Sequence, residues 1–295
     1  MNFNQKDAKA NAIAIQINDF SQNITSIPAA AFPIEIDVLS RQLVDSINRV
    51  YYFQLIQSRQ IDIKRTDPNC SLFDPLRAIL YYKNNNLDEA FWLAFLTTHF
   101  GENYHSNWNL TKNFYNNLGQ SPRLTWANVS NNPTLIDNWV FRYNSSGMKL
   151  KFGNHRKYES FSQLRDVIDT YINIVNNNGG HQRLFQPNQN EQPKEQFKRL
   201  SKELKFYRFA RLGMFDYLSL IYKTQLATIQ ANSCHIAGST GPKAGAKRLF
   251  GQLSNHDLDR LSIQLADHLG IGYQEFEDAI CNWQKSPDVY VSYTG

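Results

Sequence analysis

Apolar residues recur along most of the chain at spacings of three and four, the periodicity of helices with one buried face. This pattern predicts helices over 36–58, 75–84, 87–101, 162–176, 197–213, 214–221, 254–270 and 273–287. Residues 87–101 are apolar on nearly every face, so we expect this helix to be buried on several sides, with Asp88 and Glu89 complementing the dipole of its first turn. The only competing strand pattern is short, at 139–143, so the fold class is mostly α.

Two segments poor in apolar residues, 176–180 and 186–194, are typical of a flexible linker. Residues 1–35 are rich in Asn, Gln and Ala, and we expect an arm or short helix there, followed by an extended linker. The predicted organisation is therefore an N-terminal arm over 1–35, a first helical subdomain over 36–180 and a second over 195–295.

Composition narrows the class of protein. The chain has 42% apolar residues, enough for a sizeable core, and a net charge of +5, which permits an anionic partner such as nucleic acid. Its 3 widely spaced cysteines and the lack of a His-x-x-x-His pair argue against a disulfide framework and a metal site, so we expect no metal and no cofactor. Without a signal layout or an apolar run of about 20 residues, we expect a cytoplasmic protein with no membrane contact and no obligate protein partner.

The stretch 236–251 combines glycines with cations between two predicted helices, the first ending near Leu226 or Ile229. Helix, Gly-x-x-Gly and helix resemble a helix–hairpin–helix DNA-binding element, whose amides meet one backbone phosphate, although its usual spacing is Gly-x-Gly. The alternative is a glycine-rich helix cap with solvated lysines. The candidate DNA contacts are Gly238, Gly241, Lys243, Gly245, Lys247 and Arg248.

A second cationic segment places three cations beside Tyr158 on a predicted loop that leads into a helix. Cations next to an aromatic ring suit a surface that holds phosphates and bases. A solvated helix start, capped by Glu159 and Ser160, would explain the same residues. The candidate DNA contacts here are His155, Arg156 and Lys157.

Three acids are candidates for catalysis. Asp259 lies 18 positions after Gly241 (259 − 241), where helix–hairpin–helix glycosylases carry a catalytic Asp, whereas the nearby Asp257 suits a helix cap, as does Asn255. Asp216 is isolated among apolar residues and needs a partner, for which Arg208 and Arg211 are expected. Asp278 lies in a row that lines either solvent or a site, with Glu275, Asn282 and Lys285.

Five segments together resemble the α-glutamyl/putrescinyl thymine pyrophosphorylase family, clade 3: 87–101, 152–160, 207–220, 239–251 and 274–287. The likeness runs from about residue 70 to the C-terminus, and residues 277–287 are its most specific piece. It implies work on hypermodified bases in DNA. That work is either construction of modified thymines by displacing pyrophosphate from an activated base, or excision of modified bases as a defence against phage.

The interpretation that we favour is a DNA glycosylase, with a fold similar to helix–hairpin–helix glycosylases, that flips a bulky modified base out of double-stranded phage DNA and excises it. A carboxylate would stabilise the positively charged sugar or activate water. The alternatives are a transferase that replaces pyrophosphate with an amine, its phosphates held by cations including Lys243, and a non-catalytic DNA-binding protein. His99 is expected to be a hydrogen-bonded structural residue. Residues expected to stack on the base or line its pocket are Tyr158, Trp283, Trp92, Arg208, Arg211, Asn282 and Lys285.

Overall fold

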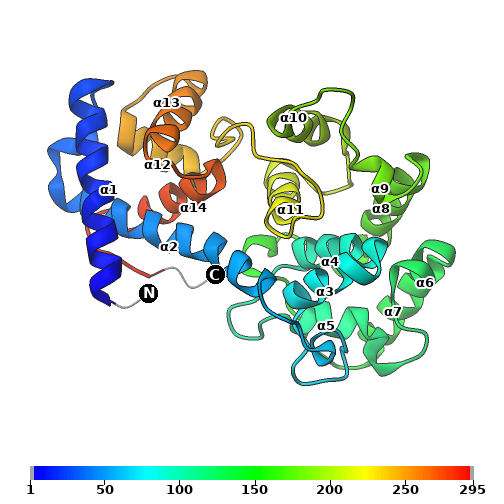
Figure 1. Cartoon of the computed structure of the whole chain (residues 1–295). Helices are drawn as coiled ribbons and strands as arrows, with labels where there is room; N and C mark the ends of the chain where they lie inside the picture. Colours follow the sequence, from blue (N-terminus) through cyan, green and yellow to red (C-terminus); the bar gives the residue numbers. More distant parts are fainter. Residues whose placement is uncertain (1–2, 293–295) are drawn as a thin grey trace. The chain divides into compact units, whose positions relative to one another are not determined.

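The computed structural model describes residues 3–292, and this part of the chain is built of helices joined by turns, with no strand (Figure 1). The mostly α class is confirmed. Two compact units divide the chain. Unit 1 combines the chain up to Gln54 with the chain from Ala231 onward, and unit 2 comprises Leu55–Gln230. The subdomains expected from the sequence follow chain order, whereas unit 1 joins segments from both ends.

Unit 1 begins with a long helix of 21 residues, where the sequence predicted an arm or a short helix. Ile17 and Phe20 of this first helix are buried, and Phe20 packs edge-on against His268 at 5.4 Å between ring centroids. The helices of unit 1 are α1 (Phe3–Asn23), the 3-10 turn η1 (Pro28–Ala31), α2 (Pro33–Gln57, which crosses the division), α12 (Gly241–Phe250), α13 (Asn255–His268) and α14 (Tyr273–Trp283).

Two glycines allow α12 to pack directly on α14. A Cβ at Gly245 would overlap the carbonyl oxygen of Ile280, and one at Gly241 would lie 2.7 Å from Cys281 Sγ. Trp283 on α14 is fully buried in the same core. Its predicted role in stacking on a base is therefore wrong, because no face of its ring reaches solvent.

Unit 2 contains the remaining helices, and α7 covers residues 139–143, where the sequence showed a short competing strand pattern. The predicted helix over 197–213 is also wrong, because residues 204–210 leave helical geometry and Arg208 adopts a left-handed φ of 62°. The helices are α3 (Pro75–Asn85), α4 (Leu87–Phe100), α5 (Asn109–Tyr115), α6 (Trp126–Asn131), α7 (Thr134–Ser145), α8 (Leu164–Asn177), α9 (His181–Leu184), α10 (Pro193–Glu203) and α11 (Arg211–Lys223), with 3-10 turns η2 (Ile63–Arg65), η3 (Asn117–Gly119), η4 (Asn154–Arg156) and η5 (Phe161–Gln163).

Helix α4 forms the core of unit 2, and every residue from Glu89 to Phe100 is buried, as its all-round apolar pattern predicted. Phe95 stacks on Tyr171 with 3.9 Å between centroids. Trp92 is fully buried, and its Nε1 donates a hydrogen bond to the carbonyl of Leu124 at 2.8 Å. Trp92 is therefore a core side chain, and its predicted role in stacking on a base is wrong.

Candidate functional site

The C-terminus of α4 meets the segment that contains η4 through a close contact of two glycines. Gly153 N donates to the carbonyl of Phe100 at 2.7 Å, and a Cβ on Gly153 would lie 2.6 Å from the carbonyl carbon of Gly101. Gly101 also has a φ of 68°, which favours glycine. Only backbones without side chains approach so closely, and the contact fixes η4 beside the end of α4.

Arg156 at the end of η4 is buried, with 2% of its surface exposed. Its Nη2 donates to Asp216 Oδ2 at 3.0 Å, and its Nη1 donates to the hydroxyl of Tyr158 at 2.8 Å. Gly213 makes room for this guanidinium, since a Cβ there would lie 2.9 Å from Nη1. Arg156 therefore positions Asp216 instead of contacting a phosphate, which corrects the DNA-binding role expected of it.

Arg208 is committed to a different acid from the one expected. Its Nε donates to Glu159 Oε2 at 2.7 Å and its Nη2 to the carbonyl of Tyr158 at 2.5 Å. The Glu159 carboxylate, through this hydrogen bond, raises the pKa of Arg208. The sequence pointed to Arg208 and Arg211 as partners of Asp216. Arg208 pairs with Glu159, and Asp216 forms an ion pair with Arg156, 60 positions away in the chain.

We call the group formed by Arg156, Tyr158, Glu159, Arg208 and Asp216 the arginine–carboxylate site. The Asp216 side chain is 35% exposed and Tyr158 is 51% exposed, whereas Arg156 and Glu159 are buried. His155 and Lys157 on the same segment are exposed. The site therefore presents a carboxylate and an aromatic ring to solvent, with exposed His155 and Lys157 on the segment that carries Arg156.

His99 lies behind this site, buried among aromatic rings. Its ring stacks on Phe95 at 6.1 Å and on Phe209 at 5.8 Å between centroids. Burial, with a smaller contribution from the charges of Arg156 and Arg208, lowers its pKa to about 3. Within residues 3–292 neither ring nitrogen has a hydrogen-bond partner, so the imidazole is neutral as expected but lacks the expected hydrogen bond.

The other candidate acids have structural partners in unit 1. Asp259 Oδ1 accepts a hydrogen bond from the backbone N of Ile236 at 3.0 Å, which secures the segment before α12. Asp278 lies 3.4 Å from Arg49 Nη2. Asn282 accepts from Lys285 Nζ at 3.2 Å on the exposed face of α14.

The sequence predicted Asn255 or Asp257 as the N-cap of α13, but the N-cap is Ser254. Its hydroxyl accepts a hydrogen bond from the backbone N of Asp257 at 3.1 Å. The same hydroxyl donates to the carboxylate of Asp257, and this contact lowers the pKa of Asp257. Asp257 is therefore part of the capping arrangement at the start of the helix.

The glycine-rich stretch lacks the helix expected before it. Helix α11 ends at Lys223, and residues 224–240 contain no helix in this structure. Arg248 forms a two-point ion pair with Glu35, both distances being 2.8 Å, and Gly238 is exposed. Lys243 and Lys247 are only partly exposed on α12.

A signal that the sequence analysis missed lies at Gly270-Ile271-Gly272, between α13 and α14. Gly270 has a φ of 63°, and the N of Ile271 closes α13 by donating to the carbonyl of Ala266 at 3.0 Å. The first turn of α14 follows directly, and the carboxylate of Glu275 folds back over Gly272. This is the Gly-x-Gly spacing that 238–241 lacks, and the sequence alone could have indicated it.

The five segments that carried the family resemblance form two groups, one within each unit. Segments 87–101, 152–160 and 207–220 converge at the arginine–carboxylate site, and 239–251 packs on 274–287 through Gly245. Between residues 3 and 292 no helix is long and apolar enough to cross a membrane, and no group of three or more His, Cys, Asp or Glu side chains could hold a metal ion.

Fold and site together define an all-α protein with a carboxylate held at its surface by a buried arginine. The chain belongs to the alpha-glutamyl/putrescinyl thymine pyrophosphorylase clade 3 family, whose model matches residues 34–295. The family name denotes an enzyme that acts on a modified thymine. Searches of curated proteins and of solved structures returned no match.

Proposed function

We propose that the protein is a DNA glycosylase that excises a modified thymine-type base from phage DNA as a defence. The observation that carries the proposal is the geometry of Asp216, a partly exposed carboxylate 3.0 Å from buried Arg156, beside the exposed ring of Tyr158. Membership of a family named for modified thymine supports the choice of substrate.

The chemistry that suits this geometry is cleavage of the N-glycosidic bond. The base leaves with the bonding electron pair, and positive charge develops on the sugar, where the Asp216 carboxylate stabilises it. Water then adds to the sugar carbon and loses a proton, while the departing base gains one. Tyr158 offers a face on which a flipped base can stack.

DNA contact is assigned in this proposal to the hairpin Gly270–Gly272, with Lys243 and Lys247 on α12 as the cations. The Glu275 carboxylate, which folds back over Gly272, has to turn away before a phosphate binds there. Amides at a helix N-terminus after a tight hairpin suit one backbone phosphate without reading sequence. Asp288 then becomes a further acid to test, since it is exposed and lies 16 positions after Gly272 (288 − 272).

The test is base release from several phage genomes with different modifications, followed by mass analysis of the released base and strand cleavage in alkali. We expect Asp216→Asn to lower the rate at least 100-fold, the usual range for a positioned acid or base. Asp166→Asn is the matched control, an exposed acid in the same unit. Modified DNA that keeps every base would contradict the proposal. If activity is lost only in Asp259→Asn, Asp278→Asn or Asp288→Asn, that acid and not Asp216 is the catalytic carboxylate.

A transferase that displaces pyrophosphate is the second candidate, and the exposed His155 and Lys157, which flank Arg156 in the chain, favour it. Cations of this kind would hold the leaving phosphates. The same incubation separates the two reactions, because transfer of an amine releases pyrophosphate and increases the mass of the base without creating an abasic site.

A further inference from the structure

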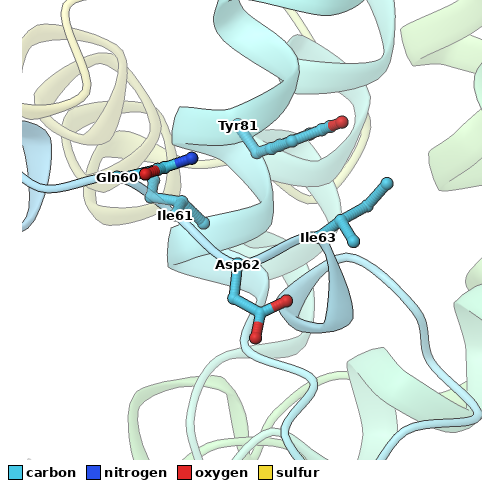
Figure 2. A pocket seen from close by; sticks show the side chains of 5 residues that line it. All are labelled: Gln60, Ile61, Asp62, Ile63 and Tyr81. Atoms are coloured by element: carbon cyan, nitrogen blue, oxygen red, sulfur yellow. The ribbon is translucent and has the colours of Figure 1, made fainter.

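Two adjoining hollows open on unit 2 beside α3, with volumes of about 370 and 510 Å³. They share Gln60, Ile61 and Tyr81, and we call them together the α3 groove (Figure 2). Volumes of this size fall in the range of sites for small molecules. No residue of the arginine–carboxylate site lines the groove.

Carboxamides are five of the twelve residues that line the groove. Gln60 and Asn84 are exposed, and their side chains make no hydrogen bond to any residue that the structure describes. A carboxamide both donates and accepts, so it can pair with the edge of a nucleobase. The carboxamide residues that border the groove are Gln57, Gln60, Asn84, Asn85 and Gln225.

Two cations border the groove without a carboxylate of their own. Arg59 is exposed and has no ion pair within residues 3–292, and Lys83 donates to the neutral Oε1 of Gln225 at 3.1 Å. Burial lowers the pKa of Lys83, which means that its charge is incompletely solvated. In the same unit Arg123 and Arg199 both pair with acids.

The acid at the groove does not neutralise these cations. Asp62 accepts a hydrogen bond from the backbone N of Lys64 at 2.9 Å, and its carboxylate points away from Tyr81 (Figure 2). Gln225, which orients Lys83, has a φ of 55°, a left-handed geometry that is uncommon for residues other than glycine. Arg59 and Lys83 are therefore available to an anionic ligand at the groove.

We propose that the α3 groove binds a nucleotide. Arg59 and Lys83 hold the phosphate, Gln60 and Asn84 hydrogen-bond the base edge, and Tyr81 offers its ring for stacking. The nucleotide comes either from a DNA strand or from the free pool. This inference does not rest on the glycosylase proposal, which places the chemistry at Asp216.

The test uses the full chain with two probes, thymidine 5′-monophosphate followed by calorimetry and a fluorescent ten-residue oligothymidylate followed by anisotropy over a range of salt concentrations. We expect the double variant Arg59→Gln/Lys83→Gln to bind at least tenfold more weakly. For the oligonucleotide the salt slope falls by about 0.7, because the one phosphate that these two cations hold in a single strand is no longer neutralised. Tyr81→Leu weakens binding at least fivefold, because one stacked base is lost.

Arg183→Gln is the control, an exposed arginine of unit 2 outside the groove lining, and should bind like the wild type. Binding of the mononucleotide identifies a free nucleotide as the ligand, and binding of the oligonucleotide alone identifies a strand. The proposal is overturned if neither probe binds or if the double variant binds both unchanged while its circular dichroism and melting temperature match the wild type. Asp216→Asn should bind both probes like the wild type. Binding at the groove can therefore be confirmed or refuted whether or not the protein releases bases.

Discussion

The hydrogen bonds and pKa values of individual acidic side chains in this protein depend on partners that are far away in the sequence. Glu89 lies in the first turn of α4, as expected, and is also buried. It accepts hydrogen bonds from the hydroxyl of Tyr115 at 2.7 Å and the backbone N of Trp126 at 2.9 Å. Burial raises its pKa to about 7. Asp88 beside it contacts His181 Nδ1 at 2.7 Å. Two neighbouring acids in the first turn of α4 therefore have pKa values shifted in opposite directions, because burial raises that of Glu89 and the hydrogen bond with His181 lowers that of Asp88.

The buried imidazole of His99 should make the protein sensitive to acid. Its pKa is about 3 in the folded state and near 6.5 in the unfolded state, so below pH 6.5 the unfolded chain binds a proton that the folded chain does not. The contribution of neutral His99 to the free energy of unfolding is therefore fully present above pH 6.5. It falls by about 1.4 kcal/mol for each pH unit below 6.5, down to the folded-state pKa. We expect His99→Leu to remove about 2–3 kcal/mol of the loss between pH 7 and pH 4.5.

Urea unfolding at these two pH values measures that difference. His256→Gln is the control, because the His256 side chain is 87% exposed. If His99→Leu and His256→Gln lose the same stability in acid, His99 does not cause the acid sensitivity.

At the scale of elements, glycine on a helix can mark packing as readily as a ligand. Gly245 lies in the middle of α12, a position where alanine would normally favour the helix by about 1 kcal/mol. Its missing side chain is what allows the carbonyl of Ile280 to approach. Packing and helix propensity therefore make opposite predictions for the same substitution.

We expect Gly245→Ala to lower the free energy of unfolding by about 1–3 kcal/mol, because overpacking outweighs the gain in propensity. Ala244→Gly, at an exposed position of the same helix, should lose about 1 kcal/mol from propensity alone. Chemical denaturation followed by circular dichroism measures both. A stabilised Gly245→Ala protein would mean that α12 and α14 are not in this close contact.

Helix positions were largely predictable from the sequence, whereas the site was not. The all-round apolar pattern of residues 87–101 placed α4 within a residue, because burial of every face leaves a local pattern. The break after α10 was missed because Arg208, a good helix former, is held in a left-handed geometry by Glu159, 49 positions away. The pair of Arg156 and Asp216 likewise depends on tertiary contacts with no local signature.

At the scale of the whole molecule, the five tryptophans are divided unequally between the units. Trp283 is in unit 1 and is fully buried, whereas Trp92, Trp108, Trp126 and Trp139 are in unit 2. Tryptophan fluorescence therefore reports mainly on unit 2, with a single reporter for unit 1.

We expect the destabilisation caused by Gly245→Ala to appear in circular dichroism and in the fluorescence of the wild-type background. In a Trp283→Phe background it should persist in circular dichroism but shift the fluorescence midpoint much less, because the remaining tryptophans follow unit 2, and separate units can unfold separately. Equal midpoint shifts by both probes in that background would show instead that the two units unfold as one.

The discontinuity of unit 1 also sets an order of events during synthesis. Helix α1 leaves the ribosome long before α13, against which its Phe20 packs and which is translated more than 200 residues later. Unit 2 is complete in sequence before that point, at Gln230. A prematurely terminated chain therefore keeps the arginine–carboxylate site in a finished unit but leaves the apolar face of α1 uncovered, a feature that chaperones and proteases can recognise.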